Sequence, residues 1–202
     1  MVELSAAADA TDEDPSGGTE LWVVRHGETA WSADGRHTSV TDVPLTPDGE
    51  KAARAIGERL AHTRFDLVLT SPRRRARHTA ELAGFPDAEV DDDLAEWAYG
   101  DYEGVTTATI RESVPGWTIW THPCPGGESA DQVGRRLDRV VARVRDHGGR
   151  VLVVGHGHAS RVLAARWLDQ PVEEGRNFAL DTATISVLGY ERETPVLTRW
   201  NC

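Results

Sequence analysis

Cysteine is scarce in this 202-residue sequence, and long apolar runs are missing. Its two cysteines, Cys124 and Cys202, are too few for a disulfide framework, which favours a reduced setting. No uncharged apolar run reaches the roughly 20 residues that are needed to cross a bilayer. The first residues combine neither the basic start nor the apolar core of a signal peptide. We therefore expect a soluble, cytoplasmic protein.

Positive charge is also in short supply. Lys and Arg total 22 against 33 Asp and Glu, which gives a formal net charge of −11 and a pI near 5.1. Such a charge repels polyanions at long range, so we expect neither nucleic acid nor a membrane as a partner. A small anion can still bind in a local basic pocket.

The chain divides into a short tail and one domain. Residues 1–19 carry acidic side chains, Pro and a Gly pair but no Lys or Arg, which is typical of a disordered tail. Residues 20–202 are enough for a single domain with a sizeable core. A hydrophobic content of 39% with seven Trp fits a folded protein.

Short apolar runs alternate with helical patterns along this domain. Runs that are apolar on both faces predict buried strands, and helices between them predict a parallel sheet. Strands are expected at 21–24, 66–69, 151–154, 184–190 and 195–200, and helices at 46–62, 72–83, 129–147 and 158–168. The predicted fold is α/β, a three-layer sandwich with a mostly parallel sheet and helices on both faces. Residues 91–128 fit this pattern poorly and are expected to form a small excursion over one edge.

Each of the three strongest strands ends in a polar motif. These motifs are Arg25-His26-Gly27, Thr70-Ser71-Pro72 and Gly155-His156-Gly157. In open α/β sheets, ligands bind beyond the carboxyl ends of the strands. A single histidine at a strand end is usually structural, but two of them, each followed by Gly, favour a functional site.

The arginine cluster at 73–77 contains one residue that is expected to point inward. Arg75 shares a helical stripe with Thr79 and Leu82, at spacings of four and seven residues. Arg73, Arg74 and Arg77 are expected to be solvated. A buried arginine needs an anion, and Arg75 together with Arg25 would hold a phosphate through forked hydrogen bonds.

The spacing of His156 and His158 also fits a metal site, but no Cys, Asp or Glu lies nearby to complete the ligands. The helix that opens near Gly157 offers backbone N–H groups, which favour an anion. We therefore expect neither a metal nor a cofactor.

Glu96 is the candidate acid, because its apolar neighbours Leu94, Trp97 and Tyr99 favour a protonated carboxyl group.

Five ordered motifs together resemble the histidine phosphatase superfamily, the phosphoglycerate-mutase-like proteins. They cover about residues 20–200 and read RHGETAW, PLTPDG, SPRRRARHTAELA, LAEWAYGDYEG and VVGHGHASR. The stretches GRHTSVTDVPLT, DDDLAEWAYGDYEG and CPGGES look closest to actinobacterial acid phosphatases and fungal sugar-bisphosphatase relatives.

The resemblance implies a role for each matching residue. His26 would be the nucleophile that becomes phosphohistidine, and Glu96 would be the proton donor. Arg25, Arg75 and His156 would complete the catalytic phosphate pocket. Ser32 stands where the family often has Asn. The expected substrate-binding residues are Ser32, Thr38, Ser39, Tyr99 and His158.

The implied activity is the hydrolysis of small phosphate monoesters. A cofactor-dependent phosphoglycerate mutase and a non-catalytic phospho-ligand binding module are the alternatives. Aromatic residues with few cations around the predicted site favour small phosphoesters over highly anionic inositol phosphates. The sequence leaves the natural substrate and the oligomeric state open, and a homodimer through a sheet edge is compatible with it.

Overall fold

Six strands form one sheet in the computed structural model, which describes residues 18–202. The predicted acidic tail lies outside the described residues except for Gly18 and Thr19. The strands are β1 (Glu20–Arg25), β2 (Leu67–Thr70), β3 (Glu89–Val90), β4 (Arg150–Gly155), β5 (Ile185–Glu191) and β6 (Thr194–Arg199). Their order is β3-β2-β4-β1-β5-β6. The first four are parallel to one another, and β5 pairs antiparallel with both β1 and β6.

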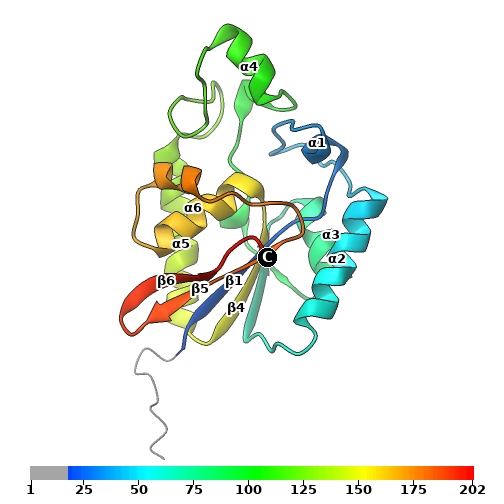
Figure 1. The fold of residues 1–202 in the computed structure, drawn as a ribbon, viewed down its shortest axis with the longest axis vertical. Helices are drawn as coiled ribbons and strands as arrows, with labels where there is room; N and C mark the ends of the chain where they lie inside the picture. Colours follow the sequence, from blue (N-terminus) through cyan, green and yellow to red (C-terminus); the bar gives the residue numbers. More distant parts are fainter. Residues whose placement is uncertain (1–17) are drawn as a thin grey trace, which may run out of the picture.

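Helices cover both faces of the sheet, as Figure 1 shows. α2 (Pro47–Leu60) and α3 (Arg74–Leu82) pack on one face, and α5 (Ala130–His147) and α6 (Gly157–Trp167) on the other. The shorter helices are α1 (Ala30–Ala33), α4 (Thr107–Ser113) and the 3-10 turns η1 (Asp92–Leu94), η2 (Gly100–Tyr102) and η3 (Val172–Asn177). The predicted three-layer α/β fold is therefore confirmed.

Local sequence explains where the long helices begin. Thr46 caps α2 by accepting the Gly49 N–H at 3.0 Å, and Pro47 occupies the first helical position. Ser129 and Gln132 form a reciprocal capping box at the start of α5. The inward face of α5 then buries its apolar residues Val133, Leu137, Val140, Val141 and Val144 against the sheet.

The segment 91–128 is an excursion in chain path but belongs to the main core. Trp97, Ile110 and Trp117 are buried in the same apolar cluster as β1, β4, α5 and α6. Within this segment, α4 lies farthest from the sheet, at the top of Figure 1. The two-residue strand β3 was not predicted, because it is too short to show a periodicity.

Strand register brings the three polar motifs to one edge of the sheet. β1 and β4 are neighbours, with Arg25 opposite Gly155. β2 lies on the other side of β4, with Thr70 opposite Val154. The residues that follow these strands therefore meet beyond the carboxyl ends, as the sequence predicts. No helix within residues 18–202 has the length and apolar stretch required to cross a membrane.

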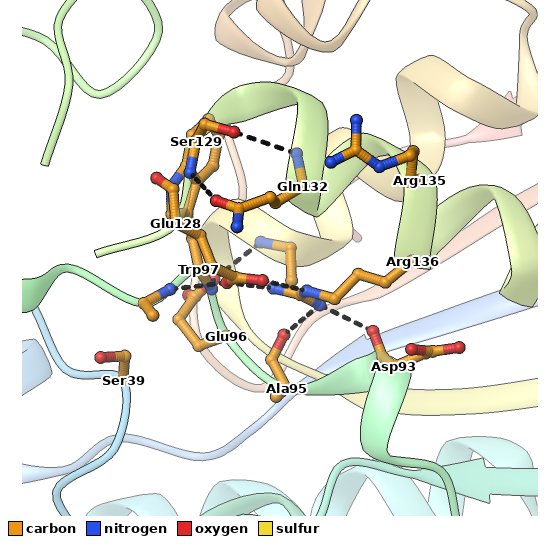
Figure 2. A network of polar contacts seen from close by, with 12 residues as sticks. Ser39, Asp93, Ala95, Glu96, Trp97, Glu128, Ser129, Gln132, Arg135 and Arg136 are labelled. Carbon is orange, nitrogen blue, oxygen red and sulfur yellow. Dashed lines mark hydrogen bonds and ion pairs between the residues drawn. The ribbon is translucent and has the colours of Figure 1, made fainter. Parts of the chain in front are cut away.

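The segment that carries Glu96 is fastened to α5 by Arg136 (Figure 2). Arg136 forms a two-pronged ion pair with Glu128, at 2.9 and 3.0 Å. Its Nη1 donates to the carbonyl oxygens of Asp93 and Ala95, both at 2.7 Å. Glu128 in turn accepts the Ala98 N–H. One buried guanidinium thus fixes the backbone on both sides of Glu96.

We expect Arg136→Met to lower the free energy of unfolding by about 3 kcal/mol, because it leaves Glu128 and two carbonyl groups without their donor. Urea unfolding measures this loss. The matched control is Arg135→Met, which removes an exposed arginine one residue earlier and is expected to change stability by less than about 0.5 kcal/mol. Equal losses in the two variants would show that the network does not fasten this segment.

Candidate active site

His26, which directly follows β1, is held as a neutral ring with one nitrogen facing Arg75. Its Nδ1 lies 2.7 Å from the carbonyl oxygen of Gly27, which assigns the proton to Nδ1. Its Nε2 accepts a hydrogen bond from Arg75 Nε at 3.3 Å. Burial, and then the charges of Arg75 and Arg25, lower the pKa of His26 well below its ordinary value. Nε2 therefore keeps an unprotonated lone pair in mildly acidic solution.

The glycine after His26 is required by packing. A Cβ at Gly27 would lie 2.5 Å from the carbonyl oxygen of Gly49 in α2. The Gly27 N–H donates to Thr79 Oγ1 at 3.0 Å, which ties the turn to α3. This glycine allows a close approach between the backbone of the loop and that of α2.

Arg75 is buried on α3, as its helical stripe predicts, and is held by main-chain oxygens. Nη1 donates to Thr41 O at 3.1 Å, and Nη2 donates to Thr38 O at 2.9 Å and Ser39 O at 3.2 Å. These bonds orient the guanidinium without neutralising it. The loop 38–41 therefore sets the position of the cation that faces His26.

That loop is itself held by Glu103. The Glu103 carboxylate accepts the Ser39 N–H at 2.9 and 3.0 Å, the Thr41 N–H at 3.0 Å and the Ser39 hydroxyl. Partial burial would raise the pKa of Glu103, but these hydrogen bonds outweigh it and lower the pKa. An ionised Glu103 thus positions Arg75 through the loop.

His156 lies beside His26, with ring centroids 5.2 Å apart. Its Nε2 is 2.6 Å from the hydroxyl of Ser71, the residue after β2. Burial, and then the charge of Arg75, lower its pKa well below the ordinary value. Its Nδ1 and the Nε of Arg25 are buried and have no hydrogen-bond partner within residues 18–202. Two buried nitrogen atoms near His26 therefore lack a polar partner.

Glu96 occupies the N-terminus of α6. Its Oε1 accepts the N–H groups of Trp97 and Ala159, both at 2.8 Å, and its Oε2 accepts the His158 N–H at 3.0 Å. The helix N–H groups that the sequence assigned to a bound anion are therefore used by Glu96 itself. Oε2 accepts one of these hydrogen bonds, whereas Oε1 accepts two.

These groups surround a cavity of about 250 Å³. Arg25, His26 and Glu96 line it, while Arg75 and His156 contact His26 without lining the cavity. A second hollow of about 190 Å³ shares three lining residues with the cavity, namely His37, Thr107 and His158. The five residues predicted to be catalytic are thus brought together at one edge of the sheet.

Four of the five residues predicted to bind substrate line this cavity: Ser32, Thr38, Tyr99 and His158. Ser39 does not line it, so its assignment to substrate binding stays a prediction. The Ser39 side chain is buried and hydrogen-bonded to Glu103, and its carbonyl group accepts from Arg75. The Ser32 hydroxyl is engaged with the main chain of Thr29 in the cap of α1.

The histidines of the GHGH motif have separate partners. His158 Nδ1 lies 2.6 Å from the Tyr99 hydroxyl, whereas His156 contacts Ser71. Burial, and then the charge of Arg161, lower the pKa of His158 well below its ordinary value. The two rings therefore serve different parts of the site.

Three cavity residues with basic side chains were not predicted from the sequence: Arg36, His37 and Arg161. Arg161 follows His158 by three residues on α6, so helical spacing alone places the two on one face. His37 is buried between Tyr99 and Trp117, with ring centroids 4.7 and 5.3 Å away. Arg36 and His37 lie in an irregular loop, where no periodicity marks the inward side chains.

Comparison with known proteins identifies the class to which this site belongs. The family model described as histidine phosphatase superfamily (branch 1) matches residues 21–202. A solved structure from Mycobacterium tuberculosis superposes with a TM-score of 0.87 at 47% identity, covering 90% of this chain and 96% of that one. The chain belongs to the histidine phosphatase superfamily.

Two relatives narrow this class. An acid phosphatase of Mycobacterium tuberculosis is 50% identical over 175 residues, which cover 85% of this chain and 86% of that protein. A sedoheptulose 1,7-bisphosphatase of Saccharomyces cerevisiae is 37% identical over 185 residues, covering 75% of this chain and 68% of that protein. The predicted resemblance is confirmed. Within the superfamily the chain is a phosphatase, and the mutase alternative is not favoured.

Buried neutral histidines make stability depend on pH. Burial lowers the pKa of His37 to about 4 from an ordinary value of 6.5. Between these values the unfolded chain binds the proton and the folded chain does not. We therefore expect stability to fall as the pH drops from 6.5 to 4, by about 1.4 kcal/mol per pH unit for this residue.

Urea unfolding at several pH values between 7 and 5 tests this expectation. His37→Gln should reduce the slope of unfolding free energy against pH by about 1 kcal/mol per unit near pH 5.5. Because the slope is compared, a constant loss of stability in the variant does not affect the result. Identical slopes in the two proteins would contradict the prediction.

Proposed function

We propose that the protein hydrolyses small phosphate monoesters through a phosphohistidine on His26. The observation that carries this proposal is the pairing of an unprotonated His26 Nε2 with the Arg75 guanidinium at 3.3 Å. A nucleophile must be neutral to attack, and phosphoryl transfer needs cations that spread the charge of the transferred group. Arg25 and Arg75 supply two such cations beside the attacking atom.

In the first step, His26 Nε2 attacks phosphorus and forms the P–N bond as the ester P–O bond breaks. The hydrogen bond that Arg75 Nε donates changes its acceptor from His26 Nε2 to a phosphoryl oxygen. The unpartnered nitrogen atoms of Arg25 and His156 are the groups that would contact the other phosphoryl oxygens. Protonated Glu96 gives its Oε2 proton to the departing alkoxide, which leaves as an alcohol.

In the second step, water attacks phosphorus and the P–N bond breaks. The Glu96 carboxylate takes the proton of this water, which restores the donor for the next turnover. Inorganic phosphate leaves, and His26 returns to its neutral Nδ1–H form.

The cytoplasmic location, the absence of nucleic-acid and membrane partners, and a homodimer stay predictions of the sequence.

The covalent step is tested by trapping the intermediate. Rapid quenching with a ³²P-labelled substrate is expected to give a labelled protein whose label is lost in acid and retained in alkali. His26→Ala should abolish the label, because it removes the attacking nitrogen. His147→Ala, which removes an exposed histidine at the end of α5, is the matched control and should keep it. Label retained in His26→Ala would exclude His26 as the nucleophile.

The role of Glu96 is tested by changing the leaving group. Glu96→Gln should lower kcat/KM for an alkyl phosphate by about 10²- to 10⁴-fold, since an alkoxide needs a proton to leave. It should lower kcat/KM for p-nitrophenyl phosphate much less, because nitrophenolate leaves without one. Glu112→Gln, an exposed change on α4, is the control. Equal losses on both substrates would remove Glu96 from the donor role.

A further inference from the structure

Arg161 is a half-buried cation that lines the catalytic cavity without an acidic partner. Its Nε donates to Gly175 O at 3.0 Å and its Nη2 to Arg176 O at 3.1 Å. The guanidinium lies over the ring of Trp120, 4.7 Å from the centroid. No carboxylate within residues 18–202 forms an ion pair with it. A partly buried cation without an acidic partner is stabilised when an anion enters the cavity.

The guanidinium of Arg161 is preorganised. A Cβ at Gly175 would lie 2.7 and 2.8 Å from two ring carbons of Trp120, so the absence of a side chain at Gly175 lets the indole pack beside it. The two carbonyl bonds and the indole face fix the plane of the guanidinium. Its Nη1 makes no hydrogen bond within the described chain and stays available. A planar fork held in advance loses little entropy when it binds a carboxylate or a phosphate.

Arg161 lies on the leaving-group side of the reaction centre. It follows His158 and Ala159 on α6, and the N–H groups of these two residues hold Glu96. Arg25, Glu96 and Arg161 all line the same cavity, so the three groups face one space. Since the proton donor must meet the departing oxygen, Arg161 faces the alcohol part of the substrate.

The other cations around the cavity have different uses. In the proposed function, Arg25 and Arg75 bind the phosphoryl group that is transferred. Arg36 also lines the cavity, but it is exposed and lies 3.6 Å from Asp34. Arg161 is therefore the cation that is both held in place and not neutralised on the alcohol side.

We propose that Arg161 binds a second anionic group, a carboxylate or a phosphate, on the alcohol part of the substrate. The preferred substrates are then phosphate monoesters of acidic or phosphorylated alcohols, a narrower class than small phosphoesters in general. This inference rests on the proposed function. The inference also revises the expectation that few cations surround the site. That expectation did not count Arg161, because the sequence did not show that its side chain lines the cavity.

Three open-chain substrates of matched length test the proposal. Sorbitol 6-phosphate has an uncharged far end, 6-phosphogluconate ends in a carboxylate, and sorbitol 1,6-bisphosphate ends in a second phosphate. In the wild-type protein, kcat/KM for at least one anionic substrate should exceed that for sorbitol 6-phosphate about tenfold or more, as expected for a charge-assisted hydrogen bond. The two anionic substrates distinguish carboxylate from phosphate recognition.

Arg161→Gln should bring this ratio close to one, and Arg161→Lys should restore part of it. Each ratio is taken within one variant, so a loss of folded enzyme cancels. Arg77→Gln removes an exposed arginine of α3 and is the control, with a wild-type ratio. An unchanged ratio in Arg161→Gln, or a wild-type enzyme that hydrolyses all three equally well, would overturn the role of Arg161. Hydrolysis of none of them, with no labelled His26, would instead overturn the proposed function and the inference that rests on it.

Discussion

Guanidinium groups held by peptide oxygens, without a paired carboxylate, are the constraint on which this site depends. Arg25 donates to Leu180 O, Arg75 to three carbonyl groups of the loop 38–41, and Arg161 to two carbonyl groups of η3. A peptide oxygen orients a cation without cancelling its charge. Arg136 shows the opposite arrangement, since its ion pair with Glu128 leaves little charge for a ligand. A chain with a net charge of −11 thereby keeps a local field that attracts a small anion.

The same arrangement sets the protonation of the neighbouring histidines. Burial and uncompensated guanidiniums both disfavour an imidazolium, so the pKa values of His26, His156 and His158 are all lowered. A nucleophile that stays neutral in mildly acidic solution follows directly. Its cost is that the unfolded chain takes up protons that the folded chain refuses, which weakens the fold as the pH falls. The same lowered pKa values therefore keep the nucleophile neutral and reduce the stability of the fold in acid.

How much of the site the sequence could predict depended on whether a residue sits in a regular element. His26 and His156 follow strands, and Arg75 sits on a helical stripe, so periodicity and strand ends locate all three. Thr38 and Ser39 are neighbours in a loop, and only Thr38 reaches the cavity. What separates them is the bond network to Glu103, about sixty residues away in sequence. No local pattern carries that information, just as none marks the two residues of β3.

The α/β layers were predictable because the strands 21–24, 66–69 and 151–154 are apolar on both faces and alternate with helices, of which α2 and α5 begin with side-chain caps. Arg161 was not predicted, and the reason differs from the one that separates Thr38 from Ser39. Its helical spacing from His158 was available, but an arginine on a helix is usually solvated or paired, and the sequence alone does not show which acids are near. Among the described residues, the arginines that line the cavity and form no ion pair with a carboxylate are Arg25 and Arg161. Since Arg25 serves the transferred phosphoryl group, Arg161 is best explained by a charge on the substrate itself.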